Sequence, residues 1–168
     1  MTHRVGFHET DAMGIVHHAN YLHHFERARV AWLEAHDQPY TAWIAADRHF
    51  AVTRVELDYR RPARFDDRIE IATWLEGVGG ASLSMGYVIR RGDEILVTGR
   101  TEHASVDGQG RVRRLPPADR ARLVLRALAV PGGNDASTGA GGEAGPSAGP
   151  GTRAGQGMER GTARRDPA

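Results

Sequence analysis

The sequence has no cysteine, no lysine and no long apolar run, and each absence removes a class of site. Without cysteine, the chain can form no disulfide, no thiolate metal site and no cysteine nucleophile. No stretch approaches the roughly 20 apolar residues of a membrane-spanning helix. The first residues, M-T-H-R-V-G-F-H, also lack the apolar run of a signal peptide. We therefore expect a cytoplasmic protein with no membrane span.

Lysine is missing although the chain has 22 residues counted as lysine or arginine, so all of these are arginine. A phosphate that is held by a charged side chain other than histidine must therefore be held by arginine, whose planar fork suits bidentate contacts. The formal net charge is only +1, which gives no global field of the kind that attracts nucleic acid. We therefore expect no nucleic-acid partner.

The end of the chain differs in composition from the rest. From Pro131 to Ala168 there is no leucine, isoleucine, valine, phenylalanine, tyrosine or tryptophan, and glycine, alanine, serine and proline dominate. Such a segment cannot bury enough apolar surface to offset the entropy of ordering it. The chain length suits one domain. We therefore predict one domain at residues 1–130 and a disordered tail at residues 131–168.

The rest of the chain predicts one long helix and an antiparallel sheet. Apolar residues recur at helical spacing between Asn20, the expected N-cap, and His36, and they form a stripe of Leu22, Phe25, Ala28, Trp32 and Ala35. Alternation predicts strands at residues 4–8, 51–59, 69–76, 81–90 and 94–105, and a last helix is expected at 118–128. Because one helix covers such a sheet only partly, this α+β fold predicts a homodimer at least.

The best reactive group lies just before the long helix. Asp11 is followed by Gly14, which lets the backbone turn tightly, and by an apolar pair at Ile15 and Val16. The helix start offers unpaired N–H groups and a partial positive charge that can hold an oxyanion. A carboxylate a few residues upstream faces the same small volume. Such a pair can attack an acyl carbonyl, although aspartate also occurs at such positions simply as a turn residue.

The segment D-A-M-G-I-V-H-H-A-N-Y at residues 11–21, followed by F-E-R-A-R at residues 25–29, closely resembles the acyl-CoA thioesterases of the hotdog fold. Within that family it is most similar to the 4-hydroxybenzoyl-CoA thioesterase and YbgC-type group. The family pattern is an aspartate, a glycine three residues on, a valine, a polar patch and a helix tyrosine, matched here by Asp11, Gly14, Val16, His17-His18 and Tyr21. The resemblance covers about residues 5–128 and implies that about five antiparallel strands wrap one long helix.

The resemblance also implies catalytic roles at the helix entry. Asp11 would act either as the nucleophile or as a general base on water. The backbone N–H of His18 would polarise the thioester carbonyl, and its imidazole would orient water or substrate. Some relatives have a tyrosine in the first strand where this chain has Phe7, so the role of that hydroxyl is missing or falls to Tyr21 or Tyr59. The implied catalytic set is Asp11, His18 and Gly14.

Partners follow from the same resemblance. Family members are homodimers or homotetramers with active sites at the dimer interface. Their substrate is an acyl-CoA, so coenzyme A is part of the substrate and no cofactor is expected. Basic residues hold its phosphates, and the candidates here are Arg60, Arg61, Arg64, Arg90, Arg91, Arg113 and Arg114. The predicted substrate-binding set is His17, Tyr21, Tyr59, Arg60, Arg61 and Arg91.

Histidines near the helix start raise the alternative of a metal site. His17, His18, His23 and His24 form pairs separated by five to seven residues, whereas two ligands on one helical face need a spacing of three or four. We therefore expect no metal, and we interpret His23 and His24 as solvated or interfacial residues.

Three other functions stay open at this point. A hotdog enoyl-CoA hydratase would use an aspartate and a histidine at a different spacing. A thioesterase could also act on acyl groups carried by acyl carrier protein. A non-catalytic acyl-CoA-binding module is the third alternative, although the intact Asp11 and Gly14 argue against it. The sequence does not identify the acyl group.

Overall fold

The computed structural model describes residues 1–128 of the 168-residue chain, and the predicted tail at residues 131–168 lies outside the described part. The strands are β1 (Thr2–Arg4), β2 (His49–Tyr59), β3 (Arg68–Val78), β4 (Ser82–Arg91) and β5 (Glu94–Val106). The helices are the 3-10 turn η1 (Phe7–Glu9), α1 (Asn20–His36), α2 (Tyr40–Ala45) and α3 (Pro117–Leu128). Within residues 1–128, no helix has the length and apolar character needed to cross a membrane.

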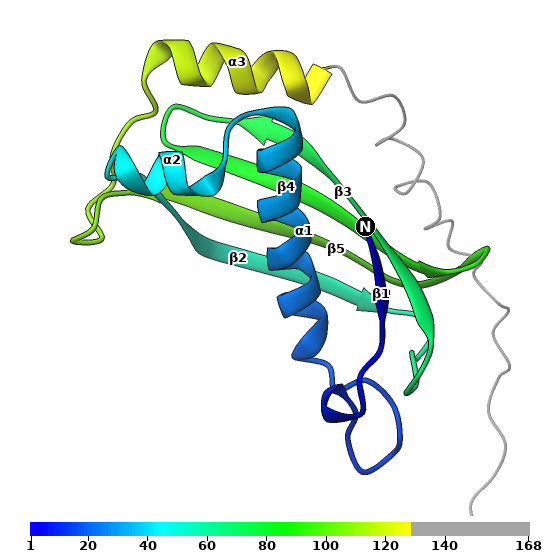
Figure 1. The fold of residues 1–168 in the computed structure, drawn as a ribbon. Coiled ribbons are helices and arrows are strands. Elements are labelled where there is room, and N and C mark those ends of the chain that lie inside the picture. Colours follow the sequence, from blue (N-terminus) through cyan, green and yellow to red (C-terminus); the bar gives the residue numbers. More distant parts are fainter. Residues whose placement is uncertain (129–168) are drawn as a thin grey trace, which may run out of the picture. The chain divides into compact units, whose positions relative to one another are not determined.

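The five strands form one sheet in the order β1-β3-β4-β5-β2, and every neighbouring pair is antiparallel. Helix α1 lies across one face of this sheet (Figure 1). The segment that precedes α1 loops around one end of the helix and leads back to β1 at the sheet edge (Figure 1). This is the predicted α+β arrangement, with one long helix wrapped by a five-stranded antiparallel sheet.

The core fills the space between α1 and the sheet. The ring of Phe25 stacks on that of Tyr87, with the ring centres 4.1 Å apart. Gly99 of β5 makes this contact possible, because a Cβ atom there would lie 2.5 Å from the Phe25 ring. The alternating apolar residues of β3 and β4 are buried as the period-two pattern predicted: Ile69, Ile71, Leu75, Leu83, Met85, Tyr87 and Ile89.

Helix α1 has the predicted bounds, but its buried face differs from the predicted stripe. Leu22 and Ala35 of that stripe are exposed, and the buried residues of the helix are Tyr21, His24, Phe25, Ala28, Arg29, Trp32 and Leu33. The interpretation of His24 as a solvated or interfacial residue was therefore wrong within this chain, because its side chain is 1% exposed. The predicted N-cap was also wrong: Ala19 occupies that position, and the Asn20 amide donates to the Glu9 carbonyl oxygen at 2.7 Å.

The first strand also differs from its prediction. A strand was expected at residues 4–8, but β1 ends at Arg4, and the chain turns at η1 because the Glu9 carboxylate accepts a hydrogen bond from the Gly6 N–H at 2.6 Å.

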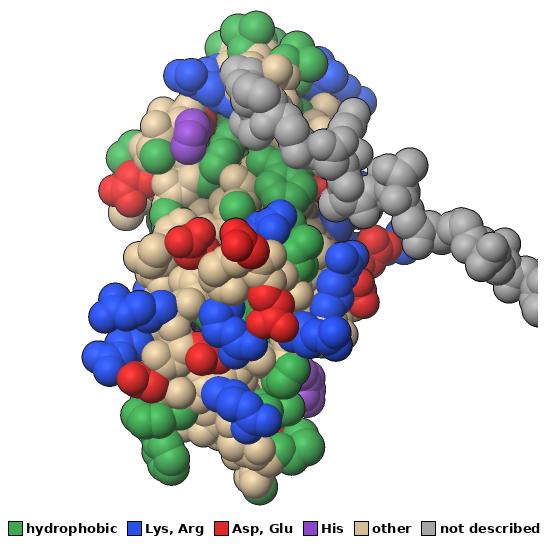
Figure 2. Space-filling model, turned by 90° about the vertical axis from the view of Figure 1, so that its right-hand side faces the viewer, with side chains coloured by type: hydrophobic (Ala, Val, Ile, Leu, Met, Phe, Trp, Pro, Cys, Tyr) green, Lys and Arg blue, Asp and Glu red, His purple; other side chains and the backbone are tan. Residues whose placement is uncertain are grey.

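One side of the molecule carries acidic and basic side chains close together, with apolar groups toward both ends (Figure 2). Charge on that side is therefore mixed in sign, as the small net charge suggests.

Candidate active site

The loop that carries Asp11 is a tight turn closed by backbone hydrogen bonds. The Gly14 N–H donates to the Asp11 carbonyl oxygen at 2.9 Å, and the Asp11 N–H donates to the Ile15 carbonyl oxygen at 2.9 Å. Gly14 has a φ of 70°, in the left-handed region that a residue with a Cβ atom enters only at a cost. Glycine at this position therefore fixes the path of the loop.

One oxygen of the Asp11 carboxylate is part of this turn. Its Oδ1 accepts a hydrogen bond from the Met13 N–H at 2.8 Å, in the way that aspartate often begins a turn. Its Oδ2 makes no hydrogen bond within residues 1–128. Asp11 therefore combines the two roles that the sequence left open, because one oxygen holds the loop while the other stays available for chemistry.

The loop is fastened to the segment between β2 and β3. The Val16 N–H donates to the Ala63 carbonyl oxygen at 2.8 Å, and Ile15 forms an isolated bridge with Arg64. From α1, the hydroxyl of Tyr21 accepts a hydrogen bond from the Ala63 N–H at 3.2 Å. These contacts hold the turn, the helix entry and the end of β2 in one place.

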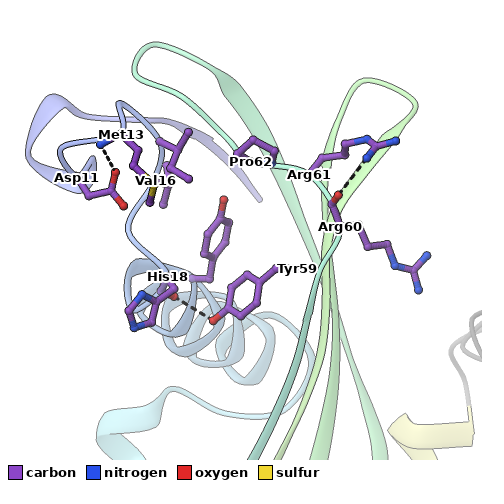
Figure 3. A pocket seen from close by; sticks show the side chains of 10 residues that line it. Asp11, Met13, Val16, His18, Tyr59, Arg60, Arg61 and Pro62 are labelled. Atoms are coloured by element: carbon purple, nitrogen blue, oxygen red, sulfur yellow. Dashed lines mark hydrogen bonds between the residues drawn. The ribbon is translucent and has the colours of Figure 1, made fainter. Parts of the chain in front are cut away.

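A pocket of about 310 Å³ lies between these three segments (Figure 3). Six of the predicted site residues line it: Asp11, His18, Tyr21, Tyr59, Arg60 and Arg61. Four further lining residues were not predicted as site residues: Met13, Ile15, Val16 and Pro62. Ile15 and Val16 were identified in the sequence only as an apolar pair, because their position on a pocket wall depends on contacts with a distant segment.

His18, which lines the pocket at the entry of α1, has an unpaired backbone donor. The N–H of His18 has no acceptor within residues 1–128, and it lies two residues before the first residue of the helix. The carbonyl oxygen of His18 accepts a hydrogen bond from the Tyr59 hydroxyl at 3.3 Å (Figure 3). Because helix N-termini carry a partial positive charge, a free N–H at this place can stabilise an oxyanion.

Two tyrosines contribute hydroxyl groups to the pocket. Tyr21 is buried, and its burial raises its pKa above the ordinary value, so the hydroxyl stays protonated at neutral pH. Its ring meets that of Tyr59 edge-on, with centres 5.6 Å apart. Phe7 is 77% exposed and packs edge-on against Phe65. The structure thus brings both candidate replacements for the missing first-strand tyrosine to the pocket.

Two cationic side chains lie at the pocket. Arg60 forms an ion pair with Asp58 at 2.9 Å, and the Arg61 guanidinium lies 3.6 Å from the Glu94 carboxylate. Both arginines are exposed, so these surface pairs hold them only weakly. They are available to an anionic group that enters the pocket.

Two other predicted substrate-binding residues lie outside the pocket lining. Arg91 forms ion pairs with Asp67 at 2.5 Å and with Glu94 at 2.6 Å, so its guanidinium already has two carboxylate partners. His17 stacks on the neighbouring His18, with ring centres 4.1 Å apart, and points away from the core as an exposed residue. Their contact with substrate stays a prediction.

Known proteins are similar to this chain in sequence and in fold. The sequence profile of the thioesterase-like superfamily matches residues 5–128. A putative esterase from Aquifex aeolicus is 31% identical over 113 residues, which cover 67% of this chain and 88% of that protein. The acyl-CoA thioester hydrolase YbgC of Escherichia coli is 40% identical over 80 residues, covering 48% of this chain and 60% of the relative. The crystal structure of a probable thioesterase from Bartonella henselae superposes with a TM-score of 0.65 at 33% identity, covering 69% of this chain and 97% of that one.

Proposed function

This chain belongs to the thioesterase-like superfamily, and from that premise we propose that it hydrolyses an acyl-CoA thioester to a carboxylic acid and free coenzyme A. One observation carries the proposal beyond the family. The uncommitted oxygen of Asp11 and the unpaired N–H of His18 belong to residues that line the same pocket. A base or nucleophile beside an oxyanion donor is the arrangement that acyl transfer requires.

In the proposed reaction, the thioester carbonyl oxygen accepts a hydrogen bond from the His18 N–H. By one route, Asp11 takes a proton from a water molecule whose oxygen bonds to the carbonyl carbon. By the other, an Asp11 oxygen itself bonds to that carbon, and water then hydrolyses the resulting anhydride. In both routes the carbon–sulfur bond breaks and coenzyme A leaves as a thiolate, which takes its proton from Asp11 in the first route and from solvent in the second. The Tyr21 hydroxyl, which stays protonated, can donate a hydrogen bond to the bound substrate.

The experiment that tests this proposal is a thiol-release assay over short, long, branched and aromatic CoA esters. Asp11→Asn is compared with the wild type, because the asparagine amide oxygen can still accept the Met13 N–H and keep the turn. We expect turnover to fall by about 10²–10⁴-fold, the usual contribution of a general acid or base. Asp93→Asn, in the exposed turn between β4 and β5, serves as the matched control and should keep full activity.

An unchanged rate in Asp11→Asn would remove Asp11 from the mechanism. No thiol release from any ester by a folded wild-type protein would favour one of the alternatives. Release from an acyl carrier protein ester alone would indicate the carrier-protein thioesterase. Saturable binding without turnover would indicate the binding module, and addition of water to an enoyl-CoA without thiol release would indicate the hydratase.

A single turnover in oxygen-labelled water tests whether Asp11 is the nucleophile. With enzyme in excess, a general-base mechanism places the solvent label in the acid product at the first turnover. If Asp11 is the nucleophile and water attacks its acyl carbon, the first product carries an unlabelled oxygen from Asp11. The label then appears in the peptide that contains Asp11. Label in that peptide, detected by mass spectrometry, therefore identifies the nucleophilic route.

We also propose that the protein is a homo-oligomer, with β2 as part of the contact. β2 is an outer strand of the sheet, and its exposed apolar residues include Val52, Val55 and Tyr59. An outer strand with exposed apolar groups is a surface that pairing covers. Light scattering coupled to gel filtration should give a mass of two or four chains, and a monomer at assay concentration would contradict the proposal.

A further inference from the structure

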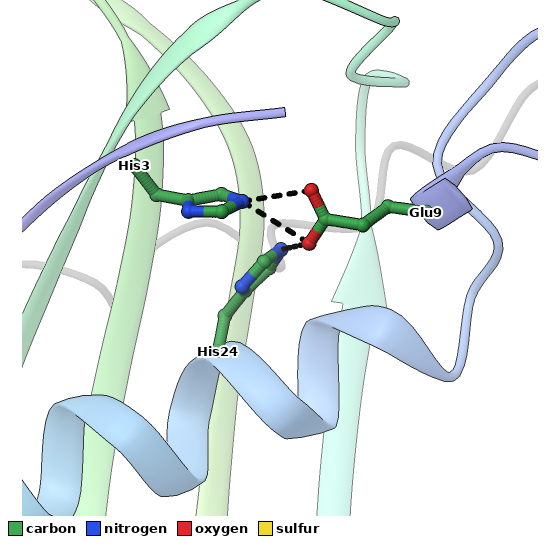
Figure 4. Close-up of side chains that lie close together, drawn as sticks. All are labelled: His3, Glu9 and His24. Atoms are coloured by element: carbon green, nitrogen blue, oxygen red, sulfur yellow. Dashed lines mark hydrogen bonds and ion pairs between the residues drawn. The ribbon is translucent and has the colours of Figure 1, made fainter. Parts of the chain in front are cut away.

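A second group of polar side chains lies next to the segment that leads into the Asp11 loop, and it is not part of the pocket lining. It consists of His3 from β1, Glu9 from η1 and His24 from α1, which point toward one another (Figure 4). One ring nitrogen of each histidine and one carboxylate oxygen all lie within 4.8 Å of one another. Three separate elements therefore converge on one small volume.

This His3–Glu9–His24 cluster is largely withdrawn from solvent. The exposed fractions of the side chains are 1% for His24, 9% for Glu9 and 17% for His3. The two imidazole rings are tilted against each other, with centres 4.6 Å apart. Polar groups in such a place normally have hydrogen-bond partners, so the contacts of each ring nitrogen matter.

His24 has no such partner. Neither of its ring nitrogens makes a hydrogen bond within residues 1–128, and its Nε2 lies 3.4 Å from a Glu9 oxygen. The buried His24 ring thus faces the Glu9 carboxylate with no hydrogen bond between them.

We propose that His3, Glu9 and His24 bind one divalent transition-metal ion of the zinc class. Two imidazoles and a carboxylate form a donor set that suits Zn²⁺, with the fourth tetrahedral position open to water. Metal–ligand bonds of about 2.0–2.2 Å place neighbouring ligand atoms about 3.3–3.6 Å apart in a tetrahedral site. Around one carboxylate oxygen, Glu9 Oε1, the His24 Nε2 already lies at 3.4 Å, whereas the His3 Nε2 at 3.1 Å must move slightly away.

The surroundings of the cluster can accommodate this change. The Gly6 N–H donates to Glu9 Oε2 at 2.6 Å and orients the carboxylate, as outer hydrogen bonds do at metal sites. Arg27 lies 3.5 Å from His3 Nδ1. Coordination through the His3 Nε2 places the ring proton on Nδ1, so the Arg27 side chain must turn away, which its exposed position permits.

A metal ion here would brace the loop that carries Asp11. The Glu9 carbonyl oxygen accepts hydrogen bonds from the Asn20 amide at 2.7 Å and from the His17 N–H at 2.9 Å. An ion held by the Glu9 side chain would therefore tie β1 and α1 to the segment that leads into the loop. The site uses only one of the four clustered histidines weighed in the sequence, and its binding of metal does not depend on the proposed thioesterase activity.

The test uses the untagged full chain, stripped with a chelator and titrated with Zn²⁺ by calorimetry. We expect one equivalent per chain, and at about 100-fold excess over the dissociation constant a rise of roughly 5–10 °C in the thermal midpoint. Co²⁺ in place of Zn²⁺ should give the intense visible absorption of a tetrahedral site. Both readouts are independent of catalysis.

Variants assign the binding to the cluster. His24→Phe and Glu9→Gln should each lower the affinity at least tenfold and remove the Co²⁺ absorption. His23→Gln, which changes the exposed neighbour on α1, is the matched control and should bind like the wild type. If His24→Phe does not fold, His3→Gln at the partly exposed edge of the cluster gives the same answer.

Two results would overturn the proposal. One is the absence of stoichiometric binding by the wild type. The other is binding that survives in His24→Phe, His3→Gln and Glu9→Gln but is lost in His23→Gln, which would place the ion on exposed histidines instead.

Discussion

Glu9 and Asp11 are two residues apart in the sequence, yet their carboxylates lie in opposite environments. The Glu9 side chain is 9% exposed, and it accepts hydrogen bonds from His3 and from the Gly6 N–H. Asp11 is only partly buried, uses one oxygen for its own turn and keeps the other free in a pocket. Similar chemical groups thus obtain different roles from their surroundings.

The two carboxylates are also mechanically linked. The backbone of Glu9 holds the helix entry through the Asn20 amide and the His17 N–H. The free His18 N–H belongs to the same entry, and His18 lines the pocket together with Asp11. The hydrogen bonds of the buried Glu9 therefore support the helix entry beside the pocket in which Asp11 would act. Substitutions of Glu9 and of Asp11, measured for both stability and activity, test this difference in roles.

The largest expected effect is that substitution of Asp11 lowers activity alone, whereas substitution of Glu9 lowers stability. Asp11→Asn should lose about 10²–10⁴-fold in turnover while the thermal midpoint stays unchanged, because the turn keeps its acceptor. Glu9→Gln should lower the free energy of unfolding by about 2–3 kcal/mol, because a partly filled network leaves buried groups unpaired. Urea unfolding and thiol release are measured on the same samples.

Glu34→Gln is the control for Glu9→Gln, since Glu34 is an exposed glutamate on α1. It should change the free energy of unfolding by no more than about 0.5 kcal/mol. If Glu9→Gln were as stable as this control, the buried cluster would have no supporting role. If Asp11→Asn unfolded easily, its lost activity would say nothing about chemistry, and the contrast between the carboxylates would fail.

A smaller effect is expected from substitution of Gly14, which shapes the loop that carries Asp11. Gly14→Ala forces a Cβ atom into a backbone with a φ of 70°, which costs roughly 1–2 kcal/mol. We expect a lower free energy of unfolding by that amount, together with reduced turnover because Asp11 shifts. Gly80→Ala is the matched control, since a Cβ atom there meets nothing within 4 Å. Equal behaviour of both variants would show that the turn tolerates other paths.

Local patterns predicted much of this molecule. The bounds of α1, the alternating faces of β3 and β4, and the turn at Gly14 follow from spacings within a few residues. The placement of Asp11 and His18 at one pocket was also predicted, because both belong to the loop and helix entry of one continuous segment. Features that depend on neighbours in sequence were therefore accessible without the structure.

Features that depend on distant partners were not. His24 was interpreted as solvated because apolar periodicity gives no signal for a buried polar residue. Its neighbours His3 and Glu9 come from other elements, so helical spacing could not reveal them. Arg91 was predicted to bind substrate because the resemblance calls for basic residues, and no sequence pattern showed that Asp67 folds against it.

The third prediction concerns the pH dependence of stability, which arises from the buried His24. Burial lowers the pKa of His24 from its ordinary 6.5 to about 4; Glu9 opposes this shift, whereas His3, Arg27 and His23 add to it. Between pH 4 and pH 6.5 the His24 imidazole is protonated in the unfolded chain but not in the folded one. The free energy of unfolding therefore rises with pH across this range and falls on acidification. The slope contributed is up to about 1.4 kcal/mol per pH unit.

Urea unfolding between pH 4 and pH 6.5 in the wild type and in His24→Phe should show a flatter dependence in the variant. Some slope will stay, because burial, aided by Arg29, also lowers the pKa of His103 to about 4. His23→Gln, an exposed change, should keep the wild-type slope. Parallel curves for the wild type and His24→Phe would show that His24 takes up its proton in the folded protein as readily as in the unfolded one.

The smallest expected effect extends the contrast to the arginines. Arg60 and Arg61 line the pocket and are held by weak surface pairs, whereas Arg91 lies outside it between two carboxylates. The double variant Arg60→Gln with Arg61→Gln should raise KM for an acyl-CoA about 3–5-fold per lost contact and leave kcat nearly unchanged, because contacts to the phosphates, which do not change during the reaction, act equally on ground and transition states.

Arg91→Gln is the informative comparison, because the resemblance predicted that this residue also binds substrate. With Asp67 and Glu94 as its partners, we expect a loss of less than about 1 kcal/mol in stability and an unchanged KM. The KM change in the Arg60 and Arg61 variant should shrink at high salt, since screened surface charges hold a phosphate less strongly. A salt-sensitive rise of KM in Arg91→Gln would instead mean that the bound phosphates draw Arg91 out of its ion pairs.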